Sequence, residues 1–413
     1  MEKNALLILS FLTVILFSCE NNDNEEDGEF ADFLVARPIT MTQAEFANSV
    51  AIIDPTPIDE SGKIYAYQDY IFVNDKYKGV HVIDNTNPES PQKISFIKIA
   101  GNVDISVKDD FLYADSLTDL IVLDISNINN IQMVNRLEGV LRDNVVWPAA
   151  EIFEWEDIDY ENEILVGWET TVERRRIEDV QIDFFAEDLA TANESGNTGQ
   201  GGSLARFKIV GDYLYAVDSH SINVFDISNL ETPQDLEDVY AGFDIETIFN
   251  RGEHLFLGSM RGMYIYSISN PATPTFLSEF EHGTACDPVV VDENHAYVTL
   301  RGGNFCGATE SGLYIVDISI IERPELKVIY PMDEPYGLGI KDDKLFVCDG
   351  NSGLKVYDKS AVPDLPQLNH FKDIVTFDVI PMEEQLLMVG DGILYQYEYL
   401  DDQIELISSL NLN

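Results

Sequence analysis

The sequence predicts an all-β protein built from seven copies of one four-stranded unit. A single aromatic or large apolar position recurs along the chain, and most neighbouring copies of it lie 41 residues apart. Repeats of about 40 to 45 residues made of short strands are typical of β-propellers, with one four-stranded blade per repeat. The sequence therefore predicts a seven-bladed β-propeller over residues 61–413. The recurring positions are Phe72, Tyr113, Tyr215, Phe256, Tyr297, Phe346 and Leu387.

The period is broken at two places. Tyr297 and Phe346 are 49 residues apart, and Tyr113 and Tyr215 are 102 residues apart. Relative to the period of 41, the first gap holds 8 extra residues and the second holds 61. We therefore expect a lengthened loop in blade five and an insertion, residues 141–201, between blades two and three.

Local composition supports strands within each unit. The runs are about 5 residues long, rich in Val, Ile, Tyr and Phe, and bounded by Asn, Asp, Gly and Pro, as strands and turns usually are. In the second unit, the run 103–108 is followed by the polar turn Asp109-Asp110, and the run 120–126 follows Tyr113. No helical period is visible in the repeats.

The third run of several units carries a common sequence motif. It ends in Asp-Ile-Ser in three copies and in Asp in a fourth. Through these motifs the chain resembles the LVIVD-repeat family, from about Lys63 to the C-terminus. The family consists of β-propeller proteins that are often surface lipoproteins of the Bacteroidetes. The resemblance implies a fold and a surface location, and it implies no settled chemistry. The copies of the motif are Leu120–Ser126, Ile222–Ser228, Leu313–Ser319 and Leu354–Asp358.

The first residues have the pattern of a lipoprotein signal peptide, expected at 1–18. An apolar run from Ala5 to Phe17 follows Lys3 and is too short to span a bilayer comfortably. Leu16 to Cys19 resembles a bacterial lipobox, which implies that Cys19 becomes the lipidated N-terminus. The alternative is a plain signal peptide with an incidental cysteine.

Residues 19–32 form an acidic stretch that we expect to be a disordered tether, because it cannot bury apolar area. Acidic residues after a lipidated cysteine resemble the signal that sends Bacteroidetes lipoproteins to the outer face of the outer membrane, although a mere spacer is the alternative. The expected location is therefore the outer membrane, lipid-anchored and exposed at the cell surface. Residues 33–60 are expected to pack on or close the propeller, with part of the segment against blade seven or the tunnel end.

The charge of the chain excludes one class of partner. With 25 Lys and Arg against 74 Asp and Glu, the formal net charge is −49. Nucleic acid phosphates would be repelled, so no nucleic-acid partner is expected. The acidity favours solubility in a salty exterior. Bound Ca²⁺ is the alternative, but no Asp-x-Asp-x-Asp-Gly loop is present, and no cofactor or metal site is expected.

The four cysteines separate by their positions. Cys286 and Cys306 fall in two loops of blade five that emerge on the same face of a propeller. An oxidising compartment then favours a disulfide between them, which would pin the lengthened loop. Cys348 lies inside a predicted strand, where a small buried thiol is the ordinary outcome.

The insertion contains residue types that are frequent at interaction surfaces. All three tryptophans of the chain lie in it, and three consecutive arginines follow them. Tryptophan and arginine dominate binding hot spots because they bury large areas and keep a polar group. The alternative is that the aromatic residues form a small core of the insertion itself. The residues are Trp147, Trp155, Trp168, Arg174, Arg175 and Arg176.

Charged residues are predicted at the mouth of the central tunnel. Positions nine residues before four of the recurring positions start the innermost strands, and two histidines belong to loops on the same face. These groups could converge on a small ligand; the alternative is a solvated ring of mutually neutralising charges. The residues are Lys63, Asp104, Arg206, Asp378, His220 and His282.

The favoured function is a surface interaction or scaffold module that is not an enzyme. It would bind an outer-membrane protein complex or an exported ligand through the Trp-rich insertion and adjacent loops. One alternative is an extracellular carbohydrate-binding protein with tryptophans as stacking platforms. Another is a hydrolase or lyase with its site at the tunnel mouth, although no catalytic residue can be assigned. A fold implies no activity, and no nucleophile motif such as Gly-x-Ser-x-Gly appears.

Overall fold

The computed structural model describes residues 30–142, 147–148, 150–155, 158–159, 161–177, 200–281, 288–302, 311–400 and 403–413. Strands dominate the described chain, and its one helix, α1 (Gln43–Ala47), is five residues long. No helix among these residues is long and apolar enough to cross a membrane.

The repeat units form seven sheets, which we number sheet 1 to sheet 7 in chain order, each built on four consecutive antiparallel strands. Sheets 1 to 3 contain β3 (Ser61–Tyr67), β4 (Tyr70–Asp75), β5 (Gly79–Asp84) and β6 (Gln92–Lys98); β7 (Ile105–Lys108), β8 (Phe111–Ser116), β9 (Asp119–Asp124) and β10 (Gln132–Leu137); and β14 (Phe207–Val210), β15 (Tyr213–Val217), β16 (Ser221–Asp226) and β17 (Gln234–Asp235). Sheets 4 and 5 contain β19 (Ile245–Arg251), β20 (His254–Ser259), β21 (Gly262–Ser267) and β22 (Thr275–Glu281); and β23 (Val289–Val291), β24 (His295–Leu300), β25 (Gly312–Asp317) and β26 (Glu325–Pro331). Sheets 6 and 7 contain β27 (Leu338–Lys341), β28 (Lys344–Cys348), β29 (Leu354–Asp358) and β30 (Gln367–Phe371); and β31 (Asp378–Pro381), β32 (Gln385–Gly390), β33 (Ile393–Tyr399) and β34 (Ile404–Asn411).

Short strands extend two of these sheets, and an eighth sheet stands apart from the repeats. Sheet 1 gains β13 (Gln200–Gly201) beside β3 and β2 (Ala51–Ile53) beside β6, while β18 (Val239–Tyr240) also pairs with β16 in sheet 3. The eighth sheet, called the insert sheet below, contains β1 (Phe30–Thr42), β11 (Ile152–Phe153) and β12 (Glu163–Arg176). The prediction of an all-β chain of repeated four-stranded sheets is thus confirmed.

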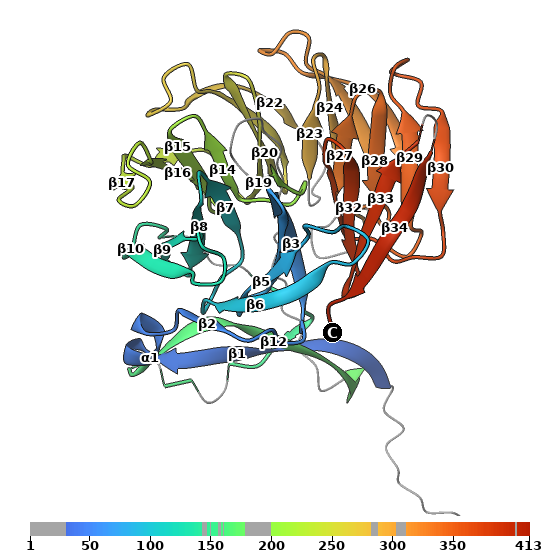
Figure 1. Ribbon diagram of the computed structural model, residues 1–413. Helices are drawn as coiled ribbons and strands as arrows, with labels where there is room; N and C mark the ends of the chain where they lie inside the picture. The colour runs from blue at the N-terminus through green and yellow to red at the C-terminus, as the bar shows by residue number, and fades with distance from the viewer. Residues whose placement is uncertain are drawn as a thin grey trace, which may run out of the picture.

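The first strands of the seven sheets contact one another in a closed cycle. Each of β3, β7, β14, β19, β23 and β27 contacts the next first strand, and β31 contacts β3. Figure 1 shows the result: sheet 7, in red, lies beside sheet 1, in blue, although they stand at opposite ends of the repeat region.

The recurring aromatic position explains the period of 41 residues. Each of its seven side chains is at most 2% exposed, and each lies on the second strand of its sheet. Tyr113 packs with Phe207 and Leu214 of the following sheet, and its hydroxyl donates to the Leu230 carbonyl at 3.0 Å. Tyr215 repeats this bond to Pro271 of the next sheet at 2.8 Å. The position is therefore the contact between neighbouring sheets.

The Asp-Ile-Ser motif lies at the end of the third strand of a sheet, where it forms a local hydrogen bond. The Asp317 carboxylate accepts from the Ser319 backbone N–H at 2.8 Å, and equivalent bonds recur in sheets 2, 3 and 6. Such turns satisfy backbone donors where a strand stops. In sheet 4 the Ser267 hydroxyl accepts from the Ser269 N–H at 3.2 Å, so serine replaces the usual aspartate in the same role.

The N-terminal residues take two courses. β1 pairs along its whole length with β12 of the insertion and does not join the repeat sheets. We expected part of residues 33–60 to lie against blade seven or the tunnel end. The later part of this segment meets the last sheet: the Ile58 N–H donates to the Leu412 carbonyl at 2.9 Å.

Candidate functional site

The three tryptophans of the insertion meet in one cluster. The ring centres of Trp155 and Trp168 are 4.8 Å apart, and those of Trp147 and Trp168 are 5.4 Å apart. Trp168 is 3% exposed. The cluster also contains Tyr77 of sheet 1 and Val103, which precedes sheet 2. The aromatic core therefore fixes the insert sheet on the first two repeat sheets.

This burial corrects the role expected for Trp168. A side chain that is 3% exposed offers no face to a partner, and the alternative, in which the aromatic residues form a core, describes it better. Gly167 precedes it on β12, and a Cβ there would lie 2.4 Å from the Cβ of Tyr77. Glycine is needed at this position because β12 and the Tyr77 side chain approach so closely.

The middle arginine of the triplet belongs to a network of four charges. The Arg175 guanidinium contacts the carboxylates of Glu154 at 2.5 Å and Glu173 at 2.6 Å. Arg37 of β1 contacts the same two carboxylates at 2.8 and 2.6 Å. Hydrogen bonds from Arg175 and Arg37 lower the pKa of Glu173. Arg37 thus ties β1 to β12, and Arg175 holds the same two carboxylates within a locally neutral network.

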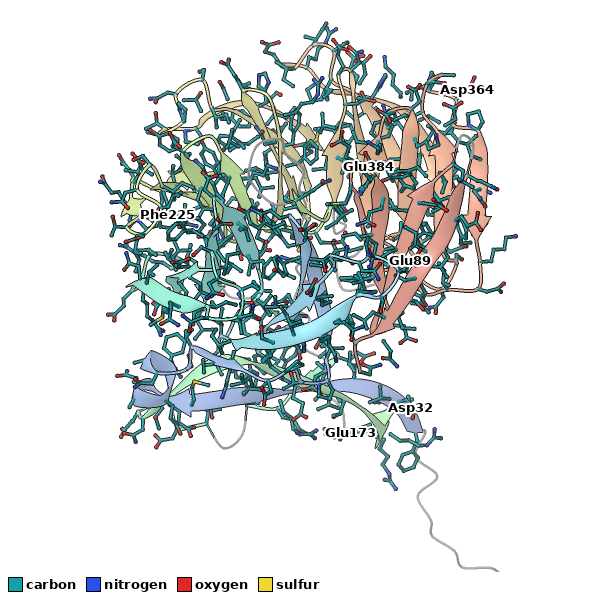
Figure 2. All side chains as sticks on the ribbon, in the orientation of Figure 1. Asp32, Glu89, Glu173, Phe225, Asp364 and Glu384 are labelled. Atoms are coloured by element: carbon teal, nitrogen blue, oxygen red, sulfur yellow. The ribbon has the colours of Figure 1, made fainter. Side chains whose placement is uncertain are left out.

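The outer end of the β1–β12 ribbon is exposed. Phe30 is 50% exposed and Val172 is 71% exposed. The Arg174 side chain is 69% exposed and lies 3.5 Å from the Asp32 carboxylate, while the Arg176 guanidinium is 5.7 Å from the centre of the Phe30 ring. Figure 2 shows Asp32 and Glu173 at this end of the ribbon, apart from the seven repeat sheets. We call Phe30, Asp32, Val172, Arg174 and Arg176 the ribbon-end surface.

The charged residues expected at the tunnel mouth come together in the structure. Asp104 is 2% exposed, and its carboxylate accepts from the backbone N–H groups of Ile105 at 2.7 Å, Phe207 at 3.0 Å and Arg206. The Lys63 ammonium lies 3.6 Å from the same carboxylate. Asp104 therefore joins the first strands of sheets 1, 2 and 3.

Asp378 joins a second set of first strands. It is fully buried, and its Oδ1 accepts from the backbone N–H groups of Ser203 at 3.1 Å and Val379 at 2.9 Å. The Ser203 hydroxyl in turn accepts from the Leu338 N–H of sheet 6. Burial raises the pKa of the Asp378 carboxyl to about 7. The alternative of a solvated ring is thus wrong for Asp104, Arg206 and Asp378, which are at most 2% exposed.

Substituting Asp378 should change how stability depends on pH. An unfolded aspartate loses its proton near pH 4, whereas Asp378 in the folded chain holds it to about pH 7. The folded state therefore binds the extra proton in this window, and its stability declines as pH rises through it. Urea unfolding of wild type and Asp378→Asn should show the wild type losing stability relative to the variant from about pH 4 to pH 7. Asp364→Asn, at an exposed position, is the control for removing a surface carboxylate, and a constant difference between wild type and Asp378→Asn over this range would contradict the assignment.

A cavity that the sequence did not reveal lies beside Lys63. Its volume is about 140 Å³, and we call it the axial cavity. Lys76 and Arg301 line it together with Lys63, and the Arg301 guanidinium lies 4.3 Å from the centre of the Tyr336 ring. Counting along the repeat could find Lys63, because it lies near the start of a first strand. The other residues lie in a turn and after strand ends, where the repeat gives no register.

Of the two histidines expected near the mouth, only His220 is among the described residues, and it does not line this cavity. The His220 ring lies 5.7 Å from the ring of Phe243, and its backbone N–H donates to Asp218 at 2.9 Å. His282 lies outside the described residues, as do Cys19, Cys286 and Cys306, so the expected lipidation and disulfide stay predictions. Cys348 is a buried free thiol, as expected. Within the described ranges, no group of three or more His, Cys, Asp or Glu residues could hold a metal ion.

The fold and the repeated sequence motif together define a β-propeller-type repeat protein. Residues 60–95, 100–138, 201–237 and 282–331 match the family model "LVIVD repeat". These segments cover parts of sheets 1, 2, 3 and 5. The chain therefore contains LVIVD repeats. No curated protein matches the sequence.

Solved structures with very different sequences share the fold. A proposed 6-phosphogluconolactonase from Bacteroides fragilis is 8% identical, with a TM-score of 0.53 over 87% of this chain and 97% of that one. Hsv2 from Kluyveromyces lactis is 10% identical, with a TM-score of 0.50 over 86% and 100%. Sqt1 from Saccharomyces cerevisiae is 9% identical, with a TM-score of 0.50 over 88% of each chain. At such identities the likeness concerns the fold alone.

Proposed function

We propose that this protein is a non-enzymatic interaction module, anchored by lipid at Cys19 on the outer face of the outer membrane. In this proposal the seven repeat sheets are the blades of a closed propeller. The module binds an outer-membrane protein complex. The observation that carries the proposal is an exposed apolar and cationic surface on an element that a buried aromatic core fixes to the repeat sheets.

The composition of the ribbon-end surface supports a protein partner. Phe30 and Val172 expose apolar area, and Arg174 and Arg176 bring guanidinium groups to a chain whose net charge is −49. Aromatic and arginine side chains dominate the binding energy of protein interfaces. Because β1 and β12 are held by paired backbone and by the tryptophan cluster, little ordering would accompany binding.

The position of the surface in the chain supports a partner at the membrane. Phe30 belongs to the ribbon-end surface, and only ten residues lie between it and Cys19. Fully extended, this stretch spans at most about 40 Å. A lipid at Cys19 would hold the ribbon-end surface within that distance of the bilayer, where the extracellular parts of outer-membrane proteins are found.

The alternatives find less support. Carbohydrate binding by stacking needs exposed ring faces, and Trp168 is 3% exposed in the aromatic core. A hydrolase or lyase at the tunnel mouth needs carboxylates that reach a substrate. Asp104 and Asp378 are buried and accept backbone hydrogen bonds that join neighbouring strands.

Charge reversal at the ribbon-end surface tests the proposal. The full chain is crosslinked in its native membrane, purified, and its partners are quantified by mass spectrometry. Val172→Glu/Arg174→Glu should lower capture of a membrane-protein partner about tenfold or more, as loss of a hot spot does. The matched control is Val134→Glu/Arg323→Glu, because Val134 is 40% exposed on β10 and the Arg323 side chain is 70% exposed. Equal capture by both variants would contradict the proposal.

The same experiment has an arm for the anchor. The Cys19→Ser variant should be lost from the membrane fraction while the protein stays folded, as checked by circular dichroism. Retention of this variant in the outer membrane at the wild-type level would contradict lipidation at Cys19. Since the ribbon-end variants keep Cys19, anchoring and partner binding are tested separately.

A further inference from the structure

We propose that the axial cavity binds a small hydroxylated carboxylate, no larger than a single sugar acid. The proposal goes beyond the interaction role, because the cavity and the ribbon-end surface share no residue. It stands on the charge of the lining, on one buried oxygen that accepts no hydrogen bond from a described residue, and on the size and entrance of the cavity.

The lining is cationic in a chain that is strongly acidic. Lys63, Lys76 and Arg301 line the cavity, against the single carboxylate of Glu60. The side chains of Lys63 and Lys76 are 11% and 14% exposed, and Arg301 is 8% exposed. Charges so far removed from water interact strongly with an anion of opposite sign. The cavity therefore favours one negative group.

The three cations come from different parts of the fold and are held in place. Lys63 lies on β3 and contacts Asp104, Lys76 lies after β4 and contacts Glu60 at 3.2 Å, and Arg301 follows β24 and lies over the Tyr336 ring. Each side chain is thus oriented before a ligand arrives. Preorganised donors bind an anion with little loss of side-chain entropy.

Asn74 supplies the observation that calls for a hydroxyl group. It lines the cavity and is 2% exposed. Its Nδ2 donates to Asn102 Oδ1 at 2.8 Å and to the Gly79 carbonyl at 3.2 Å. No described residue donates to its Oδ1. Buried acceptors are nearly always satisfied, so a ligand hydroxyl would complete this group.

Gly62 leaves room at the same oxygen. It also lines the cavity, and a Cβ at this position would fall 2.2 Å from Asn74 Oδ1. Any other residue would therefore displace the Asn74 side chain or fill the space beside it. The acceptor and the glycine together form a polar corner of the cavity.

Size and entrance limit the ligand. A volume of about 140 Å³ is below the roughly 300 to 1,000 Å³ of sites for drug-sized molecules, so the ligand is small. A groove of about 350 Å³ adjoins the cavity and shares Glu60, Ser61, Tyr336 and Phe377 with it. The groove carries further acidic residues, Asp59, Glu334 and Asp391. A polyanion would be repelled there, whereas a single small carboxylate can pass.

Calorimetric titration of the full chain tests the assignment, with D-glucuronate as the probe. Saturable binding is expected. D-Glucose lacks the carboxylate and acetate lacks the hydroxyl groups, so each should bind about tenfold more weakly or worse. Absence of saturable binding of glucuronate, or equal binding of glucose, would overturn the proposal. Tighter binding of inorganic phosphate than of glucuronate would also overturn the carboxylate assignment.

Variants locate the binding in the cavity. Arg301→Gln and Lys76→Gln should each weaken glucuronate binding about tenfold or more. Lys98→Gln removes one charge from an exposed position on β6 and should leave it unchanged. Circular dichroism shows whether each variant folds. If Arg301→Gln does not fold, Lys76→Gln, which lies at a turn, still decides the test. Equal losses in Lys76→Gln and Lys98→Gln would overturn the proposal. Val172→Glu/Arg174→Glu should bind glucuronate like wild type, so this test and the partner test can fail independently.

Discussion

Replacing Trp168 with alanine is expected to lower the free energy of unfolding of the insert sheet by about 3 to 5 kcal/mol. The side chain is 3% exposed and packs against Trp147, Trp155 and Phe153. Its removal leaves a cavity where β12 meets the repeat sheets, and the lost contacts and the empty space both destabilise.

Tryptophan fluorescence during urea unfolding measures this effect, because all three tryptophans lie in the insertion. Far-UV circular dichroism follows the repeat sheets in the same samples. Val172→Ala is the control on the same strand, and its 71% exposure predicts a change within about 0.5 kcal/mol. Similar small changes for both variants would mean that the aromatic cluster does not hold the insert sheet.

Replacing Asp104 with alanine is expected to lower the free energy of global unfolding by about 3 to 5 kcal/mol. The substitution leaves the Lys63 ammonium without this carboxylate, and it removes the acceptor of the Ile105, Phe207 and Arg206 backbone N–H groups. Breaking one partner out of a buried charged pair is far more damaging than removing an exposed charge, because the remaining polar groups stay buried.

Glu384→Ala is the matched control for Asp104→Ala. It removes one carboxylate from an exposed turn of sheet 7, which Figure 2 labels, and should change stability by less than about 0.5 kcal/mol. Urea unfolding followed by far-UV circular dichroism gives both values. A loss for Asp104→Ala as small as that for Glu384→Ala would show that the carboxylate does not join the first strands of sheets 1 to 3.

The repeated sheets could be predicted from the sequence because their contacts repeat. Tyr113 and Tyr215 each pack at a boundary between sheets, so the residue type is constrained once per unit. The hydrogen bond between Asp317 and Ser319 is local, so the same sequence motif recurs wherever a third strand ends in this way. Periodic packing and local hydrogen bonds are the features that a single sequence records well.

The insert sheet could not be predicted in the same way. β1 and β12 are separated by 120 residues, and nothing periodic links Phe33 to its partner Glu173. Trp168 is of a residue type that is common in binding hot spots, and only its position in space shows that it belongs to the core. The axial cavity depends on Lys63, Lys76 and Arg301 meeting from three segments, and only the closed cycle of first strands brings them together.

A crystal structure of the mature chain tests the central claim most directly. It should show seven four-stranded sheets in a closed ring with β31 beside β3, and a separate sheet in which β1 pairs with β12 over the tryptophan cluster. A different number of repeat sheets, an open ring, or a β1 strand built into the ring would contradict it. The ribbon-end surface and the axial cavity would then both lose their structural basis.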